Sequence, residues 1–261
     1  MSSLTNATIE RLALDNVSVS FPIYSGGSRS LKKGLLYRGS RGRIASDAND
    51  RLVVEALRNV SLRFSVGDRV ALVGANGAGK TTLLRVMAGI HEPASGAVRV
   101  SGRISPMFDI GLGIDPELSG LDNIKLRGLL LGLDPDEIDQ LIPGIGQFTE
   151  LGDYLELPAR TYSSGMLTRL TFAVATCFAP EILLMDEWIL AGDAGFLAKA
   201  EQRLKSFVEN ASVLVLASHN EQICRTWCEK AVWLDGGRVR AAGQIDEILS
   251  AYRSGAMRES G

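Results

Sequence analysis

The segment Gly74–Thr81 constrains the fold most strongly, because it reads Gly-Ala-Asn-Gly-Ala-Gly-Lys-Thr. The apolar run Arg69–Val73 before it predicts a strand, and Thr82–Ala88 after it predicts a helix that ends at Gly89. Glycines in such a loop let successive backbone N–H groups point into one concavity, where the helix N-terminus favours an anion. A glycine-rich structural turn is the alternative. The strand and the helix on either side favour a phosphate-binding loop.

The phosphate loop predicts a site for a nucleoside triphosphate and a metal ion. We expect Lys80 to act in catalysis by pairing with β- and γ-phosphate oxygens, and the Thr81 hydroxyl to bind Mg²⁺. The residues of this loop that we expect to contact the nucleotide are Gly74, Ala75, Asn76, Gly77, Ala78, Gly79, Lys80, Thr81 and Thr82.

Two further strand ends predict the rest of a phosphoryl-transfer site. The apolar run Ile182–Met185 predicts a buried strand that is followed by Asp186 and Glu187. We expect Asp186 to hold Mg²⁺ and Glu187 to polarise the water that attacks the γ-phosphate. His219 follows the predicted strand Val213–Ala217, at an edge where ligands collect in open α/β sheets, and we expect it to sense the γ-phosphate. The alternatives are a solvated strand end and a hydrogen-bonded surface or core histidine.

The composition excludes several classes of protein. The chain has 261 residues, 28 basic and 30 acidic side chains and 46% hydrophobic residues, which is typical of a soluble globular protein and not of a disordered or collagen-like one. Its net charge of −2 gives no overall basic field, so we expect no nucleic-acid partner. No apolar run approaches the ~18 residues that a membrane-spanning helix needs.

The three cysteines favour a reducing compartment, because their number is odd in a chain too long to need disulfides. His219, Cys224 and Cys228 together suggest a metal site as one alternative. No further ligands with zinc-site spacing lie nearby, so we expect Cys224 and Cys228 to be small core residues instead.

Alternating strands and helices indicate an α/β fold with a mainly parallel sheet covered by helices. Residues 10–21 predict a strand of an antiparallel β portion near the N-terminus, and Leu118–Leu157 predicts an inserted α-helical lobe. We expect a single domain over residues 1–261 with a P-loop NTPase core. Its expected parts are a catalytic core at 10–110 and 180–250, a helical lobe at about 111–179, which contains the signature motif described below, and a basic insert at 25–44.

The order of the motifs resembles one family of phosphate-loop proteins. Tyr162-Ser163-Ser164-Gly165-Met166 lies about twenty residues before Asp186, where ATP-binding-cassette (ABC) ATPases carry their signature motif. Phosphate loop, signature, acidic pair, Asp193 and His219 follow one another as in that family, over roughly residues 10–245. Ras-type GTPases would need an Asn-Lys-x-Asp guanine-binding motif, and the sequence has none.

The resemblance implies a head-to-tail homodimer that holds two ATP molecules. Each ATP would lie between Gly74–Thr81 of one chain and Ser163, Ser164 and Gly165 of its partner, where a helix N-terminus presents donors to a phosphate. Asp193 resembles a loop that crosses this interface. By itself, the segment Tyr162–Met166 would be read as an ordinary helix cap.

The family also implies a flat partner for adenine at the end of the first strand. Phe21 is our first choice and Tyr24 the second, with core packing of both as the alternative. In the loop that usually carries a glutamine, this chain has Asp109, for which we expect a metal or water contact.

Variants at the signature resemble the exporters of O-antigen, capsule and teichoic-acid polysaccharides. Ser164 and Met166 stand where the family usually has Gly and Gln, and Asp109, Pro116–Gly120 and Asp186–Asp193 add to the likeness. The resemblance implies a peripheral ATPase on the cytoplasmic face of the inner membrane that drives an integral membrane permease to export lipid-linked polysaccharide. Some exporters of this class carry a carbohydrate-binding domain after the ATPase, whereas only a short polar tail follows Ile248, so we expect substrate selection to reside elsewhere.

Two other functions remain as alternatives at this level. One is a drug or lipid exporter, and the other is a regulator that uses ATP-driven dimerisation as a switch without transport. The basic insert at 25–44 has leucines among its lysines and arginines, which favours either a short amphipathic helix against a membrane or membrane partner, or a solvated loop.

Overall fold

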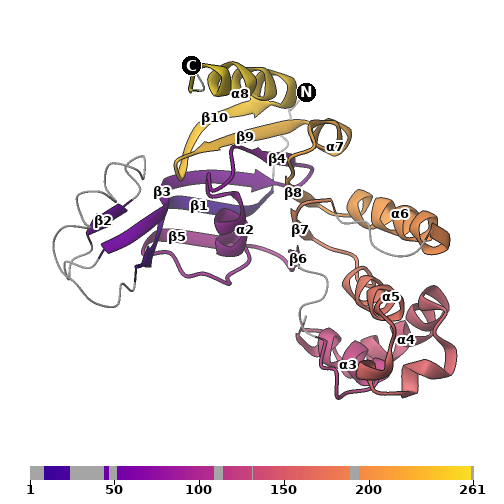
Figure 1. The fold of residues 1–261 in the computed structure, drawn as a ribbon. Coiled ribbons are helices and arrows are strands. Elements are labelled where there is room, and N and C mark those ends of the chain that lie inside the picture. The colour runs from indigo at the N-terminus through magenta and orange to yellow at the C-terminus, as the bar shows by residue number, and fades with distance from the viewer. Residues whose placement is uncertain are drawn as a thin grey trace, which may run out of the picture. The chain divides into compact units, whose positions relative to one another are not determined.

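The structure is a computed structural model that describes residues 9–23, 44–46, 52–108, 114–130, 132–188 and 194–259. The chain divides into two compact units, which are described separately below. The first unit comprises Met1–Ile104, Leu184–Trp188 and Ser212–Gly261, and the second comprises Ser105–Leu183 and Ile189–Ala211. Figure 1 shows the ribbon from the N-terminus in indigo to the C-terminus in yellow.

An antiparallel sheet forms the N-terminal part of the first unit, as the sequence predicts. Its strand order is β2-β3-β1-β5. The strands are β1 (Glu10–Pro22), β2 (Ile44–Ser46), β3 (Leu52–Ser65) and β5 (Ser95–Val100). Leu12 and Leu14 are fully buried on β1, and Leu12 lies opposite both Phe64 of β3 and Val100 of β5. The alternation of apolar residues along this strand therefore builds one face of the core.

A second, mixed sheet has the order β10-β9-β4-β8-β7-β6. Its strands are β4 (Arg69–Val73), β6 (Ile104–Met107), β7 (Ile182–Asp186), β8 (Val213–Ala217), β9 (Lys230–Asp235) and β10 (Arg238–Gln244). β4 is parallel to β8 and β9, whereas β9 and β10 form an antiparallel hairpin. The short runs Val213–Ala217 and Ile182–Met185 are almost completely buried, which explains why they are apolar without interruption. Because parallel strands end at one edge, residues that follow β4, β7 and β8 come together there.

Among the described residues, three helices belong to the first unit, namely α2 (Lys80–Met87), α7 (Glu221–Trp227) and α8 (Ile245–Glu259). Helix α2 begins at Lys80, two residues earlier than the sequence predicts, because Gly79 adopts a left-handed conformation with φ of 113° and the helix starts directly after it. Helix α8 lies along the β9–β10 hairpin (Figure 1), and its Tyr252 packs edge-on against Trp233 with ring centroids 5.8 Å apart.

The second unit is mainly helical around an aromatic core. Its helices are α3 (Gly120–Leu130), α4 (Pro135–Thr149), α5 (Ser164–Ala175) and α6 (Ala194–Glu209), with 3-10 turns at Gly152–Glu156 and Ala159–Thr161. Asp134 and Glu137 form a capping box that fixes the start of α4. Phe148, Phe172 and Phe196 come from three different helices and meet with ring centroids 5.1–6.2 Å apart. Among the described residues, no helix is long and apolar enough to cross a membrane.

Candidate functional site

The loop Gly74–Thr81 runs from the end of β4 into α2, and its glycines are required by close backbone contacts. A Cβ atom on Gly74 would lie 2.2 Å from the carbonyl oxygen of Leu234. A Cβ atom on Gly79 would lie 2.9 Å from the carbonyl oxygen of Ala56. Gly77 has a φ of 74°, in the region that favours glycine. Gly74 and Gly79 therefore leave no room for a Cβ atom, and Gly77 has a backbone conformation that favours glycine, so the loop keeps the shape that its spacing predicts.

Lys80 lies buried under this loop. Its Nζ donates hydrogen bonds to the carbonyl oxygens of Gly74 at 2.7 Å and Ala75 at 3.3 Å. Burial lowers the pKa of the Lys80 ammonium, while the nearby carboxylates of Asp186 and Glu187 act in the opposite direction. The side chain is therefore a cation held within the loop, at the place where phosphate charge would be received.

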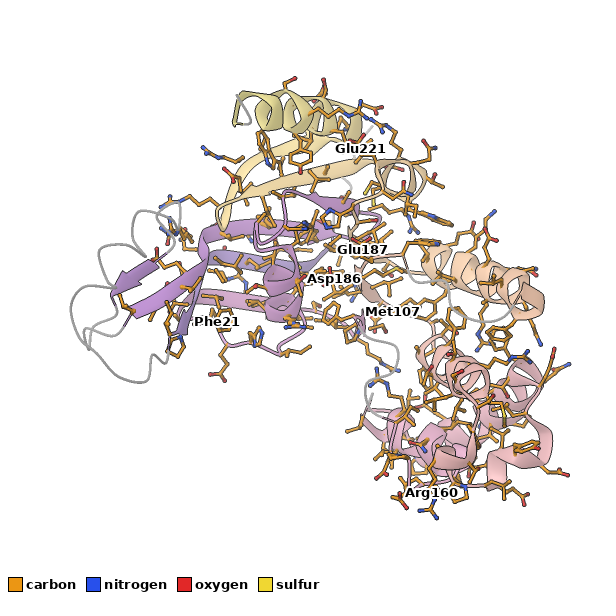
Figure 2. The ribbon with its side chains drawn as sticks, viewed as in Figure 1. Phe21, Met107, Arg160, Asp186, Glu187 and Glu221 are labelled. Carbon is orange, nitrogen blue, oxygen red and sulfur yellow. The ribbon has the colours of Figure 1, made fainter. Side chains whose placement is uncertain are left out.

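A pocket of about 290 Å³ joins the loop to residues from other strands of the first unit. The predicted site residues that line it are Phe21, Asn76, Gly77, Gly79, Lys80, Thr81, Thr82, Asp186 and His219. Gly74, Ala75 and Ala78 belong to the same loop but do not line the pocket. Figure 2 labels Phe21, Asp186 and Glu187 in this unit. One pocket thus contains a ring, a lysine, a hydroxyl and a carboxylate from separate parts of the sequence.

The Thr81 hydroxyl and the Asp186 carboxylate supply the oxygen donors in this pocket. Asp186 ends β7 and is partly exposed, and both residues line the same pocket as Lys80. Hard cations such as Mg²⁺ prefer oxygen ligands, a few from the protein and the others from phosphate and water. The donor set therefore fits the predicted magnesium ion.

Glu187 is held by the strand next to its own. Its backbone N–H donates to the carbonyl oxygen of Ala217 at 2.7 Å, and its φ of 81° is unusual for a residue other than glycine. Its Oε2 accepts a hydrogen bond from Ser218 Oγ at 2.8 Å, and its Oε1 accepts one from the backbone N–H of His219 at 3.2 Å. His219 Nε2 lies 3.8 Å from Oε1. The structure therefore brings Glu187 and His219 together.

Sequence reasoning missed two features of this arrangement. Ser218 is a buried donor to Glu187, and its only signal is its place between a predicted strand and His219. Trp188 stacks on Trp227 of α7 with ring centroids 4.9 Å apart and an interplanar angle of 19°. No periodicity links these two indoles, because the contact joins segments that are far apart in the sequence.

Phe21 lies near the end of β1 and remains 38% exposed, which is unusual for a residue of a core strand. Its ring packs edge-on against His91 at 5.3 Å, and it lines the pocket at the loop. A partly exposed aromatic ring next to a phosphate loop is a surface on which a planar base can stack. Core packing, the alternative for this residue, does not fit its exposure.

The signature residues lie at the start of α5 in the second unit. Ser163 is the N-cap of this helix, and its Oγ accepts a hydrogen bond from the backbone N–H of Met166 at 3.2 Å. Ser163 and Ser164 are exposed, and a Cβ atom on Gly165 would meet only Ser163 Oγ, at 3.9 Å. This helix end therefore offers free surface and a positive dipole to a ligand from outside the unit.

Several predicted residues lie outside the part of the chain that the structure describes. They are Tyr24, the basic insert except for the backbone of Ile44, Asp109 and Asp193.

The cysteines near His219 behave as core residues. Cys224 and Cys228 are buried, and burial raises the pKa of the Cys224 thiol to about 11 and also raises that of Cys228. Within the described residues, no group of three or more His, Cys, Asp or Glu side chains has the arrangement of a metal site.

Comparison of the sequence with known proteins gives consistent similarities. A family model described as ABC transporter matches residues 57–190. The O-antigen export system ATP-binding protein RfbE of Yersinia enterocolitica is 45% identical over 228 residues, which are 87% of this chain and 95% of that protein. A Klebsiella pneumoniae O-antigen export system ATP-binding protein RfbB is 35% identical over 91% of this chain and 95% of its own length. The teichoic acids export ATP-binding protein TagH of Bacillus cereus is 33% identical over 92% of this chain but only 42% of its own length.

Solved structures share the fold at lower sequence identity. The dimeric post-hydrolysis state of the ATP-binding cassette MJ0796 with ADP and Pi matches with a TM-score of 0.62 and 21% identity, over 90% of this chain and 98% of that one. A structure described as the ATP binding subunit of an ABC transporter matches with a TM-score of 0.65 and 22% identity, over 93% of both chains. These likenesses concern the fold, the P-loop α/β arrangement that the sequence predicts.

Proposed function

Because this chain belongs to the ABC transporter family, we propose that it is the ATP-hydrolysing subunit that powers export of a lipid-linked polysaccharide. The observation that carries the proposal is its 45% identity to an O-antigen export ATP-binding protein over 95% of that protein's length. A relative described as a teichoic acids export ATP-binding protein supports the same class of cargo. The chain itself is an ATPase of this family, and its cargo is the part that is proposed.

The loop and its neighbours would bind ATP in a defined orientation. The adenine would stack on Phe21, and the triphosphate would extend toward Lys80 and the start of α2. Thr81 and Asp186 would hold Mg²⁺, which neutralises phosphate charge when it is bound. Lys80 would exchange its hydrogen bonds to the Gly74 and Ala75 carbonyls for bonds to β- and γ-phosphate oxygens. The loop thus receives negative charge without exposing a free ammonium beforehand.

Glu187 would act as the general base in hydrolysis. Its carboxylate takes a proton from a water molecule as the water oxygen bonds to the γ-phosphorus, and the bond to the β,γ-bridging oxygen breaks to leave ADP and phosphate. Ser218 and the backbone N–H of His219 orient the carboxylate, each through one of its oxygens. His219 would contact the γ-phosphate from the end of β8.

The complete transporter would contain two copies of the chain and a permease. The exposed start of α5, with Ser163, Ser164 and Gly165, would contact the ATP bound to a second copy, and Asp193 would lie at the same interface. ATP binding would then favour the dimer and hydrolysis would release it. The chain would act at the cytoplasmic face of the membrane on a separate integral membrane permease, and we expect no nucleic-acid partner.

The test replaces the chain in its source cells by the Glu187→Gln variant and measures lipid-linked glycans by mass spectrometry. The amide cannot accept the proton, so we expect ATP binding to persist, hydrolysis to stop and a polymer to accumulate on its lipid inside the cell. Glu156→Gln is the matched control, because Glu156 is an exposed carboxylate of the second unit.

Each outcome has a distinct meaning. Accumulated lipid-linked polymer with loss of the surface polymer supports the proposal and identifies the sugar. An unchanged glycan profile in cells whose variant has lost hydrolysis contradicts polysaccharide export. That result would favour a drug or lipid cargo, or a regulatory switch, while leaving the ATPase in place.

A further inference from the structure

The second unit contains a cavity of about 440 Å³ that the proposed function does not use. It lies among the end of α4, the segment that follows α5, and α6 from Lys199 onward with Asn210 directly after it. Phe148, Phe178 and Phe207 provide three aromatic rings to its wall, and Pro180 adds a further apolar surface. Binding sites for small molecules have volumes of about 300–1,000 Å³ and mostly apolar walls. The cavity has the size and the lining of such a site.

The charge in this cavity is exclusively positive among the residues that line it. Twelve residues line the cavity, and the two charged ones are Lys199 and Arg203. Lys199 Nζ already forms an ion pair with Glu150 Oε1 at 2.7 Å. No such ion pair with a carboxylate is formed by Arg203 within the described part of the chain. Arg203 is therefore a cation whose charge remains to be balanced inside the cavity wall.

The neighbours of Arg203 fix its orientation without neutralising it. Its Nε donates to Thr176 Oγ1 at 2.8 Å, and one terminal nitrogen lies 3.5 Å from the carbonyl oxygen of Ala173. Its guanidinium carbon lies 4.2 Å from the ring centroid of Phe148. A guanidinium has five N–H donors, so these contacts leave the two on Nη1 and one on Nη2. Two adjacent nitrogens therefore still have donors for a bidentate contact with a planar anion.

Without a ligand, partial burial of the charged Arg203 guanidinium costs free energy. Desolvation lowers the pKa of Arg203, which nevertheless stays protonated because a guanidinium keeps its proton in proteins. A partly buried cation without an anionic partner loses hydration that the protein does not replace. Cys177 adds no negative charge to the wall, because burial raises the pKa of its thiol to about 12. The positive charge of Arg203 would attract an anion that enters the cavity, and no acidic residue lines the cavity to repel it.

We propose that this cavity binds a small aromatic carboxylate. The carboxylate would pair with the free edge of the Arg203 guanidinium, and the aromatic body would lie among the three phenylalanine rings. A carboxylate fits better than a phosphate, because one guanidinium balances one negative charge and its two parallel N–H groups match two carboxylate oxygens. Arg203 also connects α6 to the end of α5, so a bound carboxylate would hold these two helices together.

The test is isothermal titration of the purified full chain with 2-naphthoate, 2-naphthamide and 2-naphthyl phosphate. We expect 2-naphthoate to bind at one molecule per chain, and the neutral amide to bind at least about tenfold more weakly, because it lacks the charge-assisted contact. Arg203→Gln should weaken 2-naphthoate by about tenfold or more. A saturating non-hydrolysable ATP analogue should not displace it.

Two further variants keep the proposal testable if Arg203→Gln unfolds. Ser206→Phe fills the cavity from an exposed position on α6 and leaves Arg203 in place, so it should also weaken 2-naphthoate by about tenfold or more. Lys199→Gln removes the paired cation and should weaken binding by less than about threefold. The proposal is wrong if 2-naphthoate fails to bind at millimolar concentration, if Ser206→Phe binds it as well as the parent, or if 2-naphthyl phosphate binds more tightly.

Discussion

The Ser218 hydroxyl donates a hydrogen bond to Glu187 Oε2 at 2.8 Å, and the two residues directly follow neighbouring strands of the mixed sheet. The backbone N–H of His219 donates to the other carboxylate oxygen at 3.2 Å. Glu187 follows β7, whereas both donors follow β8. The orientation of the Glu187 carboxylate, the proposed general base, therefore depends on the pairing of two adjacent strands as well as on its own backbone.

Ser218→Ala should lower kcat for ATP hydrolysis by about tenfold while KM for ATP changes little. A hydrogen bond to a charged group contributes about 1.5–3 kcal/mol, and this one orients the base without contacting the nucleotide. Steady-state hydrolysis over a range of ATP concentrations measures both constants. Ser254→Ala, an exposed serine of α8, is the control. An unchanged kcat in Ser218→Ala would contradict the positioning role.

The stack of Trp188 on Trp227 should hold the segment after Glu187 against α7. Trp227→Ala should lower the free energy of unfolding by about 1 kcal/mol beyond the loss of buried area, because aromatic pairs contribute about 0.5–1.5 kcal/mol. It should also lower kcat, since Glu187 directly precedes Trp188 and has a φ of 81°. Trp227→Phe keeps an aromatic ring, so its free energy of unfolding and its kcat should both remain close to those of the parent. Denaturant titration and steady-state kinetics measure them, and equal behaviour of the Ala and Phe variants would count against the stack.

Local sequence patterns correctly predicted those helices and strands whose own residues form a clear apolar run or a helical periodicity. The run Val213–Ala217 is a buried strand, as its uninterrupted apolar residues predict, and residues 194–209 form α6 as expected. The start of α2 was predicted two residues too late, because periodicity begins with the first buried apolar residue whereas the helix begins after the left-handed Gly79. Patterns therefore locate elements better than they locate their ends.

Contacts between distant segments were not predictable in the same way. Nothing in the sequence near Ser218 identifies it as the partner of Glu187, because the hydrogen bond requires β7 and β8 to be neighbours. The position of Arg203 beside the end of α5, where it has no carboxylate partner among the described residues, likewise follows only from the packing of α5 and α6. Motif spacing predicts which chemistry is present, and tertiary packing determines which residues orient it.

Phe21→Ala should raise KM for ATP by about tenfold and leave kcat nearly unchanged. Stacking of a base on an aromatic ring contributes about 1–3 kcal/mol, and Phe21 lines the loop pocket, whereas Glu187, the proposed general base, is not among the residues that line it. Phe21→Trp preserves a flat surface and should keep KM within about threefold of the parent. Titration with a fluorescent ATP analogue checks the affinity directly. If Phe21→Ala binds ATP as the parent does, the adenine lies elsewhere.

Gly74→Ala should destabilise the first unit and prevent ATP binding. The added Cβ would lie 2.2 Å from the backbone oxygen of Leu234, so either β4 or β9 must move. Gly67→Ala is the matched control, because Gly67 also has a positive φ but a Cβ there would meet no atom within 4 Å. We expect Gly67→Ala to lower the free energy of unfolding by only about 1 kcal/mol, the conformational cost of alanine in a left-handed backbone. This control should still bind ATP. Thermal unfolding with and without ATP separates the two, and similar melting curves would argue against the close contact.

Glu221 should contribute stability that disappears at acid pH. It accepts hydrogen bonds from Arg253 of α8 and from Arg225, and these contacts, that with Arg253 first, lower its pKa. A carboxyl whose pKa is depressed in the folded state stabilises that state fully above its unfolded pKa of about 4.3. This contribution is lost as the pH falls through the folded pKa. Glu221→Gln should therefore lower the free energy of unfolding at pH 7 by about 1 kcal/mol, a value typical of partly exposed pairs.

The difference between Glu221→Gln and the parent should shrink as the pH drops below 4.3, the approximate unfolded pKa, because the parental carboxyl then becomes neutral as well. Denaturant titrations at several pH values measure it. Glu247→Gln is the control, since Glu247 is an exposed carboxylate on the same helix as Arg253. The control should show a smaller loss at pH 7. A loss for Glu221→Gln that stays constant from pH 7 to acid pH would mean that packing, and not charge, connects α7 to α8.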